Sequence, residues 1–157
     1  MNNINKLDDF DYKILKVVQA NNRVTSVKLA REVGLSSSAC QRRLNTMRKI
    51  GIIEKDVSVL NRNKLNRKIT IIVQILSDIE GAEHDKEFKR SMLSAPEVMQ
   101  CYYVTGDYDY VVMATFNEMG DYEEFTKKYF LKDPNIKRFN SMVVMNKVKE
   151  NLSIPLN

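Results

Sequence analysis

Apolar residues in the first fifty positions recur at helical spacing in three separate stretches. In the first stretch, Asp8 and Asp11 form the pattern of a capping box, in which each side chain accepts a backbone hydrogen bond at the start of a helix. Phe10 and Ile14 then begin an apolar stripe of the kind that faces a protein core. This pattern predicts a helix that begins near Asp8 and ends near Asn21.

Two shorter helices are predicted directly afterwards. Thr25 or Ser26 can cap the second helix, and Gly34 stands where its end needs a left-handed residue. Ser36 can cap the third helix, which Gly51 ends. Two short helices joined through a glycine and a fresh cap are typical of a helix-turn-helix, in which the later helix is the recognition helix.

The residues after the third helix predict the end of a first domain. Residues 56–60 have the composition of a strand, so we expect a short wing or connecting strand and a winged outline. Residues 61–68 are polar and poor in apolar side chains, as linkers are. The expected organisation is a DNA-binding domain over 1–60, a linker over 61–68 and a second domain over 69–157.

The second half of the chain alternates strand and helix patterns. Its order, strand-helix-strand followed by strand-helix-strand, is typical of a ferredoxin-like βαββαβ domain with one antiparallel sheet and both helices on one face. The whole chain is therefore expected to have an α+β fold. The predicted strands cover 69–76, 98–105, 110–116 and 136–148, and the predicted helices cover 86–93 and 119–131.

The first two strands of this domain carry apolar residues in both registers. A strand that is apolar on both sides needs cover on both faces of its sheet. In a short chain, the simplest second cover is another copy, so we expect a homodimer. A dimer would carry two helix-turn-helix units and would suit double-stranded DNA with a pseudo-palindromic site.

The net charge of +5 lies in the first sixty residues, where eleven Lys and Arg face six Asp and Glu, whereas the rest of the chain is balanced. Basic residues concentrate on the third helix. Such a charge run can be a solvated helix face or a surface for a polyanionic partner, and its coincidence with the helix-turn-helix pattern favours the partner. The expected contacts to base edges are Ser38, Gln41, Arg42 and Asn45, and the expected contacts to phosphates are Ser36, Ser37, Arg43, Arg48 and Lys49.

Other functional classes find little support in the composition. No apolar run is long enough for a transmembrane span or a signal sequence, so the cytoplasm is the expected compartment. Cys40 and Cys101 are expected to be small core residues, and His84 a surface residue without metal-ligand neighbours. We therefore predict no catalytic site, no metal site and no cofactor.

The sequence resembles the Lrp/AsnC, or feast/famine, family of transcriptional regulators. The resemblance covers nearly the whole chain and rests on Val33-Gly34-Leu35-Ser36, Arg43-Leu44, Gly51-Ile52-Ile53 and the run from Val104 to Tyr110. It implies a second domain of the family's RAM type, which binds small effectors, most often amino acids, where dimers meet. It also implies assembly of dimers into tetramers or octamers and a place at the nucleoid.

The resemblance further implies an effector site around the Gly-Asp-aromatic-Asp turn. From the residues alone, an ordinary hairpin turn is the favoured interpretation, and the resemblance reverses that preference. Carboxylates there could hold an ammonium group, and backbone N–H groups could hold a carboxylate. The implied site residues are Tyr103, Thr105, Gly106, Asp107, Tyr108, Asp109 and Ser141. The alternative function is an architectural nucleoid protein that binds DNA without an effector.

Overall fold

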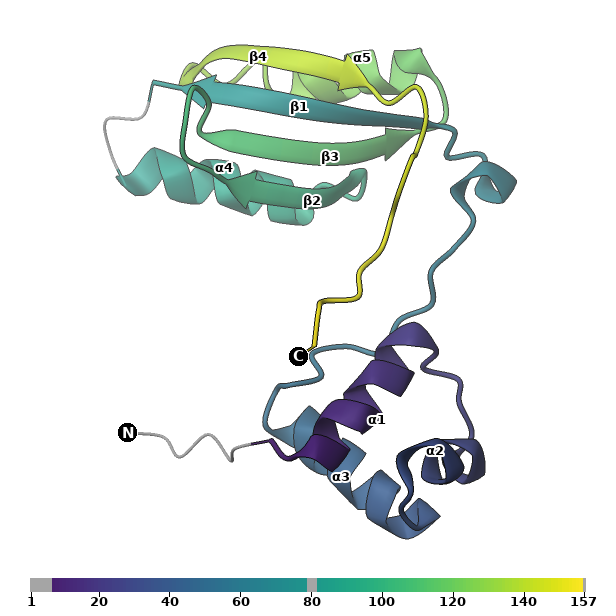
Figure 1. The fold of residues 1–157 in the computed structure, drawn as a ribbon. Helices are drawn as coiled ribbons and strands as arrows, with labels where there is room; N and C mark the ends of the chain where they lie inside the picture. The colour runs from purple at the N-terminus through teal and green to yellow at the C-terminus, as the bar shows by residue number, and fades with distance from the viewer. Residues whose placement is uncertain (1–6, 79–81, 157) are drawn as a thin grey trace. The chain divides into compact units, whose positions relative to one another are not determined.

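The computed structural model describes residues 7–78 and 82–156, and leaves the side chains of 82–84 undescribed. The prediction for His84 therefore lies outside the described side chains. The chain divides into two compact units (Figure 1). The first unit contains the residues up to Val59 together with those from Lys149 onward, and the second unit contains Leu60–Val148.

The first unit is built on three helices: α1 (Asp9–Ala20), α2 (Ser26–Val33) and α3 (Ser37–Lys49). Their ends follow the predicted signals. Asp8 and Asp11 form the capping box of α1, and Thr25 and Ser36 cap α2 and α3. Gly34 ends α2 with φ of 81°, a left-handed conformation that glycine adopts at no steric cost.

One small core holds the three helices together. Ile14, Leu29, Cys40 and Met47 are buried in it, so the predicted apolar stripes do face inward. The end of the chain also packs here, because Leu156 contacts this core. The side chain of Gln19 on α1 forms two hydrogen bonds of 3.2 Å with the backbone of Ile154. Its amide nitrogen donates to the carbonyl of Ile154, and its amide oxygen accepts the N–H of Ile154.

This division differs from the expected domain boundaries at both ends of the second domain, because the expected linker over 61–68 lies within the second unit. The segment from Lys149 onward belongs to the first unit, although it was expected to belong to the second domain. Its polar and apolar residues alternate without a helical or strand pattern long enough to show a docking site. A contact between Gln19 and Ile154 has a sequence separation of 135 residues, which no local pattern can reveal.

The prediction of a strand over 56–60 is wrong. These residues are not part of a strand, and the side chains of Val57 and Val59 are exposed. A β-branched segment needs a partner for its backbone groups before it becomes a strand. Within the predicted linker, Arg62–Leu65 forms a short 3-10 helix, η1, and Asn66 follows with φ of 59°.

The second unit contains a four-stranded antiparallel sheet with the strand order β2-β3-β1-β4. Helices α4 and α5 both cover one face of this sheet (Figure 1), as the ferredoxin-like pattern predicts. The elements are β1 (Ile69–Ser77), α4 (Ala82–Ser94), β2 (Val98–Tyr103), β3 (Tyr110–Phe116), α5 (Met119–Tyr129) and β4 (Ile136–Val143).

The strands β2 and β4 are shorter than predicted, and α4 is longer. The apolar pattern continues after Val143, but β4 ends there because its partner β1 begins at Ile69 and offers its last pairing near Thr70. The carbonyl of Thr70 accepts the N–H of Val144 at 2.9 Å, and the ladder stops at that bond.

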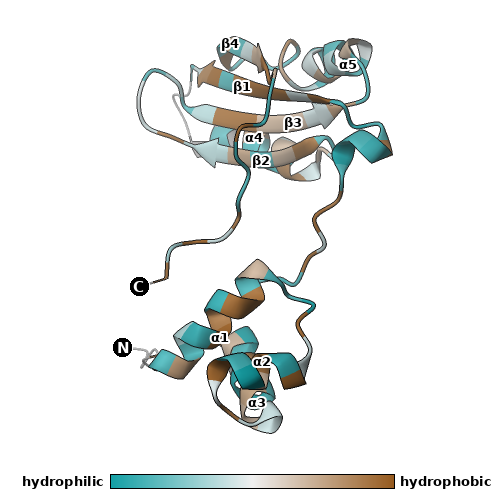
Figure 2. Cartoon of the chain, turned by 45° about the vertical axis from the view of Figure 1, so that its right-hand side comes forward, coloured by the Kyte–Doolittle hydropathy of each residue, from teal (hydrophilic) through white to brown (hydrophobic). Residues whose placement is uncertain are grey.

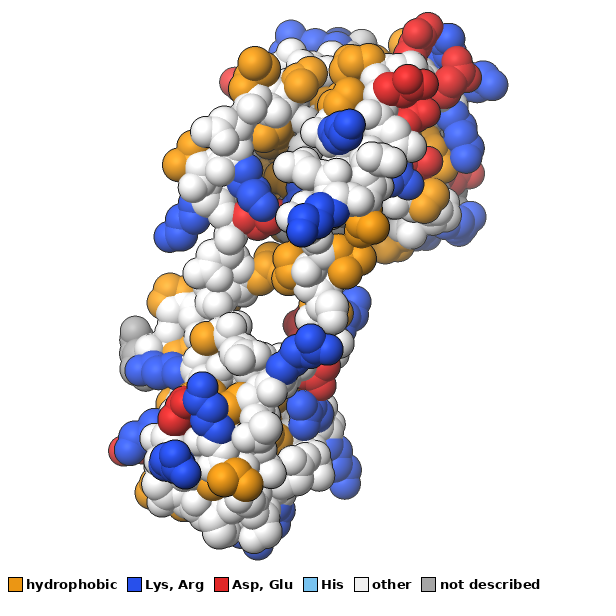
Figure 3. Space-filling view, turned by 90° about the vertical axis from the view of Figure 1, so that its right-hand side faces the viewer, with side chains coloured by type: hydrophobic (Ala, Val, Ile, Leu, Met, Phe, Trp, Pro, Cys, Tyr) orange, Lys and Arg blue, Asp and Glu red, His pale blue; other side chains and the backbone are white. Residues whose placement is uncertain are grey.

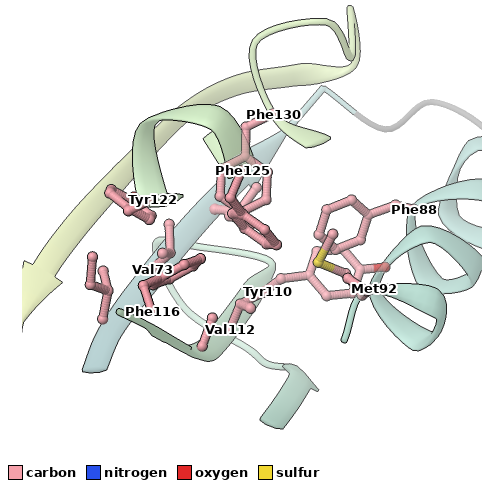
Figure 4. Close-up of a cluster of buried hydrophobic side chains, with 13 residues drawn as sticks. Val73, Phe88, Met92, Tyr110, Val112, Phe116, Tyr122, Phe125 and Phe130 are labelled. Atoms are coloured by element: carbon pink, nitrogen blue, oxygen red, sulfur yellow. The ribbon is translucent and has the colours of Figure 1, made fainter. Parts of the chain in front are cut away.

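Aromatic side chains fill the space between the sheet and its two helices (Figure 4). Phe116 of β3 meets Phe125 of α5 edge-on, with 5.3 Å between ring centroids. Phe88 of α4 lies 4.5 Å from Tyr110 at the start of β3. Burial of such rings contributes about 2 kcal/mol each, so this core fixes the sheet that carries the loops.

Among the described residues of the second unit, no helix covers the opposite face of the sheet. Its central positions are apolar, and Figure 2 shows hydrophobic colour along β1 and β3. Ile72 lies opposite Met113 on one side and Met142 on the other, and Val111 lies opposite Tyr102. These residues are half-buried or exposed, so the expectation of an apolar second face agrees with the structure.

Candidate DNA-binding helix and effector loop

Helix α3 presents one continuous polar face to the solvent. Its apolar positions Cys40, Leu44 and Met47 are buried in the first unit, which turns the other side outward. The outward side chains are those expected to read DNA: Ser38, Gln41, Arg42, Asn45 and Lys49 are all exposed. The structure therefore brings the predicted base-reading residues together on one face.

Two of these side chains form a hydrogen bond with each other. The amide of Gln41 donates to the side-chain oxygen of Asn45 at 3.1 Å, an i to i+4 pair along the helix. The part of the chain that the structure describes provides no ion pair for Arg42 or Lys49. Both cations thus remain available for a partner that carries negative charge.

Serines surround the first turn of α3. Ser36 accepts the N–H of Ala39 at 3.2 Å as the helix cap, and its hydroxyl also meets that of Ser38 at 3.1 Å. Ser37 donates to the carbonyl of Ser26 in α2 at 3.4 Å. The start of the recognition helix is therefore held by the helix-turn-helix itself, and its exposed N–H dipoles are suited to a phosphate.

Arg43, one of the expected phosphate contacts, forms ion pairs within the first unit. Its guanidinium lies 2.8 Å from a carboxylate oxygen of Asp8 and 2.8 Å from one of Asp11, and it also lies over the ring of Phe10. The N–H of Asp11 and the guanidinium of Arg43 both lower the pKa of Asp8 below its ordinary value of 3.8. Arg43 therefore ties α3 to the capping box of α1.

Arg48 is also engaged within the first unit. Its Nε donates to the carboxylate of Asp56 at 2.9 Å. This contact anchors the extended segment after α3 to the helix. Of the five residues expected at phosphates, Arg43 and Arg48 thus already have acidic partners, and sequence spacing could not show these pairs because their partners come from other segments.

The turn between β2 and β3 is the place of the expected effector loop. Gly106 has φ of 121°, a conformation that other residues rarely adopt. Thr105, Gly106 and Asp107 are exposed, and Tyr103 is 67% exposed. The loop thus presents one carboxylate and the backbone around a glycine to the solvent.

Asp109 has a structural role in this loop. Its carboxylate accepts hydrogen bonds from the N–H of Ser77 at 2.8 Å and from the hydroxyl of Ser77 at 2.9 Å, and its own N–H donates to Ile75 at 2.9 Å. These bonds attach the turn to the end of β1. Of the two carboxylates of the motif, Asp107 is therefore the one that is exposed to the solvent.

Ser141 does not join the loop within one chain. It lies opposite Val73 in the sheet, and its hydroxyl makes a hydrogen bond with that of Tyr122 on α5. The loop contacts β1 at Ser77, four residues further along the strand, which corresponds to about 13 Å. Burial raises the pKa of Tyr122 above its ordinary value, so the phenol is neutral at physiological pH.

The structure also reveals neighbours of the loop that sequence reasoning missed. The guanidinium of Arg138 on β4 lies 5.3 Å from the ring centroid of Tyr108. The ammonium group of Lys89 on α4 lies 5.2 Å from the ring centroid of Tyr103 and forms an ion pair with Asp85 at 2.5 Å. Asp85 also accepts a hydrogen bond from the hydroxyl of Tyr110. The sequence gives no signal for these contacts, because they depend on the register of the sheet and on the packing of α4 against it.

Two remaining predictions concern cysteines and metals. Cys40 is buried as expected, but the prediction of a core position for Cys101 is wrong because this residue is exposed on the edge strand β2. Burial of part of its thiol still raises its pKa above the ordinary value. Within the described ranges, no group of three or more His, Cys, Asp or Glu residues is arranged to hold a metal ion.

None of the helices in the described ranges is both long and apolar enough to span a membrane.

Two family models match the chain. Residues 7–54 match the model described as winged helix-turn-helix DNA-binding, and residues 70–154 match the model described as Lrp/AsnC ligand binding domain. The boundary between the two matches falls in the segment that contains η1.

Known proteins resemble the chain over nearly its whole length. An uncharacterised HTH-type transcriptional regulator of Sinorhizobium fredii is 44% identical over 96% of this chain and 89% of its own length. The leucine-responsive regulatory protein of Haemophilus influenzae is 29% identical over 92% of this chain and 87% of its own.

The fold has equally extensive matches among solved structures. A transcriptional regulator from Neisseria meningitidis, solved as a complex with L-Met, superposes with a TM-score of 0.91, 31% identity and coverage of 96% of this chain and 97% of that one. An AsnC family transcriptional regulator from Agrobacterium tumefaciens superposes with a TM-score of 0.89 and is 31% identical. The match covers 95% of this chain and 97% of that one. On these matches, the helix-turn-helix and the sheet domain together make the chain a transcriptional regulator of the Lrp/AsnC family.

Proposed function

We propose that the chain regulates transcription by inserting α3 into the major groove of DNA, with Arg42, Gln41 and Asn45 at base edges and Lys49 and Ser36 at phosphates. The observation that carries this proposal is the outward polar face of α3, on which Arg42 and Lys49 have no acidic partner in the described structure. Arginine pairs with guanine and amides pair with adenine in the major groove, so the face carries the groups needed for sequence-specific reading.

The roles of the two cations can be separated by experiment. A contact to a base edge distinguishes sequences, whereas a contact to a phosphate contributes on every sequence and through the salt dependence. We expect Arg42→Ala to lose affinity for a selected operator much more than for random DNA, while Lys49→Ala weakens both and lowers the salt slope. Equal losses on both DNAs for both variants would refute this assignment.

The same measurement tests the architectural alternative. The affinity of the unmodified protein for its best selected sequence is compared with that for random duplex. A specific regulator gives a ratio of at least about a thousand. A ratio near one would instead indicate a nucleoid protein that wraps DNA without reading it.

The turn at Gly106 is the proposed place of a small effector with a charged amino group, such as an amino acid. Asp107 would hold the ammonium group, since Asp109 is already bound to Ser77, and the backbone around Gly106 would face the carboxylate. The L-Met complex of the Neisseria regulator supports the ligand class. A thermal-shift screen of the twenty amino acids, with Asp107→Asn as the comparison, tests this site.

A homodimer is proposed to cover the open face of the sheet. Ile72, Val111 and Met113 form the centre of this face and leave apolar area that water solvates poorly. A second copy would also place two α3 helices against two half-sites. Light scattering of Met113→Asp tests the interface: we expect a shift from dimer or larger assembly toward monomer, and an unchanged mass would refute it.

A further inference from the structure

A cleft of about 430 Å³ opens at one end of the sheet in the second unit. This end holds the start of β1, the start of β2 and the end of β3, whereas the turn at Gly106 joins β2 to β3 at the opposite end. The lining residues are Arg67, Glu97, Asn117, Asp121, Glu124, Phe125, Lys128 and Tyr129. The cleft is thus separate from the proposed effector loop.

The acidic side of the cleft contains one carboxylate with an unmet requirement. Asp121 accepts the N–H groups of Asn117 and Glu118, and Glu124 pairs with Lys127 at 3.0 Å. Glu97 differs, because its Oε2 is buried and no hydrogen-bond donor reaches it in the described structure. A buried carboxylate oxygen without a donor is costly, so a donor from a ligand would be favourable there.

The basic side of the cleft is formed by two cations. Arg67 donates one hydrogen bond from Nη1 to the carbonyl of Thr115 at 3.3 Å, which uses one of its five N–H donors. Lys128 lies over the ring of Tyr129 at 4.6 Å. Contact with Tyr129 chiefly, and the attraction of Glu97 to a lesser degree, raise the pKa of Lys128 above its ordinary value, so this ammonium group is charged beside the cleft.

Two aromatic residues of α5, Phe125 and Tyr129, also line the cleft. The rings of Phe125 and Tyr129 lie 4.8 Å apart along α5. Figure 3 looks onto this end of the second unit, where acidic and basic side chains stand next to each other on the surface. A ligand here would meet a negative group, positive groups and an aromatic surface within one cavity.

We propose that this cleft is a second small-molecule site, which binds a zwitterion of the α-amino acid class. The ammonium group of the ligand would donate to Glu97, its carboxylate would accept from Arg67 and Lys128, and its side chain would lie against Phe125 and Tyr129. A carboxylate alone would leave Glu97 without a donor, and an amine alone would leave the two cations without an acceptor. The cavity therefore favours a molecule that carries both charges.

Its position gives this site a route to the DNA-binding unit. Arg67 lies two residues before β1, at the end of the segment that leads from the first unit. Arg67 and Glu97 both belong to the second unit, so a ligand that bridges them would hold the residues just before β1 to the start of β2. Such a ligand would change DNA affinity to the extent that it binds one arrangement of the segment better than another.

The test measures the affinity of each of the twenty amino acids for the full-length protein by calorimetry, at ligand concentrations up to about 10 mM. At least one amino acid is expected to bind with an affinity that Glu97→Gln and Arg67→Gln each reduce about tenfold or more. Glu123→Gln removes the same charge from α5 outside the cleft and is the matched control. The Glu123→Gln and Asp107→Asn variants should both bind this amino acid with the affinity of the unmodified protein.

Derivatives of the binding amino acid test the two charges separately. The N-acetyl derivative lacks the ammonium group and the amide derivative lacks the carboxylate, so both should bind at least about tenfold more weakly. The proposal is overturned if no amino acid binds, or if every binding amino acid is lost in Asp107→Asn and unaffected by Glu97→Gln. Loss in Asp107→Asn alone would leave the effector loop supported and remove the cleft. Melting curves without ligand confirm that each variant is folded.

Discussion

Neighbouring arginines on α3 should respond to substitution in opposite ways. The guanidinium of Arg43 lies 2.8 Å from a carboxylate oxygen of Asp8 and 2.8 Å from one of Asp11. The side chain of Arg43 is 28% exposed, and that of Asp11 is 14% exposed. An exposed ion pair contributes less than about 1 kcal/mol, and a sheltered charged hydrogen bond contributes about 1.5 to 3 kcal/mol. For this half-sheltered contact we expect Arg43→Gln to lower the free energy of unfolding of the first unit by about 1.5 kcal/mol.

That loss should appear as a lower melting temperature. For a unit of this size, 1 kcal/mol corresponds to about 4 to 8 °C, so the first unit should melt about 6 to 12 °C earlier. Arg42→Gln is the matched control, because Arg42 is exposed and has no acidic partner in the described residues. It should leave the melting temperature unchanged and lower the affinity for a selected operator by about tenfold to a hundredfold.

The assay combines circular dichroism with DNA titrations at 25 °C, where both variants are folded. Arg43→Gln should retain most of its DNA affinity and an unchanged salt slope. The reasoning is refuted if Arg43→Gln melts like the unmodified protein and instead loses affinity on every DNA with a slope reduced by about one contact. That result would show that Arg43 turns from Asp8 and Asp11 to a phosphate.

Two other substitutions and one change of pH test further contacts. Asp109→Ala should lower the stability of the second unit by about 1 to 3 kcal/mol in denaturant titrations, because the N–H and the hydroxyl of Ser77 both lose their acceptor, and an unchanged midpoint would contradict this role. Leu156→Ala should lower the melting temperature of the first unit by a few degrees, while the second unit should be unaffected in the same scan. Asp8 has a lowered pKa, so its stabilising effect is complete above its ordinary value of 3.8 and is lost as the pH falls further. Acid titrations monitored by circular dichroism should therefore show a smaller loss of stability below that pH in Arg43→Gln than in the unmodified protein.

Local signals in the sequence were sufficient for the helices and their ends. Asp8, Thr25, Ser36 and Gly34 act within a few residues of their own position, and each takes its predicted place. The strands of the second unit were also recognisable, because alternating or continuous apolar runs of this length suit a sheet with one covered face.

Contacts between distant segments could not be predicted in this way. The outward face of α3 followed from helical spacing, but the engagement of Arg43 depends on α1, 32 residues earlier. The carboxylates of the Gly-Asp-Tyr-Asp turn looked equivalent in sequence, and the approach of Ser77 to Asp109 distinguishes them. Register, rather than composition, also separates Ser141 from the turn and brings Arg138 to Tyr108.

The docking of the last residues onto α1 affects how the chain matures during synthesis. The ribosome makes α1, α2 and α3 first, but Ile154 and Leu156 emerge only after the entire sheet domain has been made. The nascent helix-turn-helix therefore lacks part of its packing until Ile154 and Leu156 have been made. A helix-turn-helix that needs these residues reaches its full stability only in a chain whose sheet domain has already been synthesised.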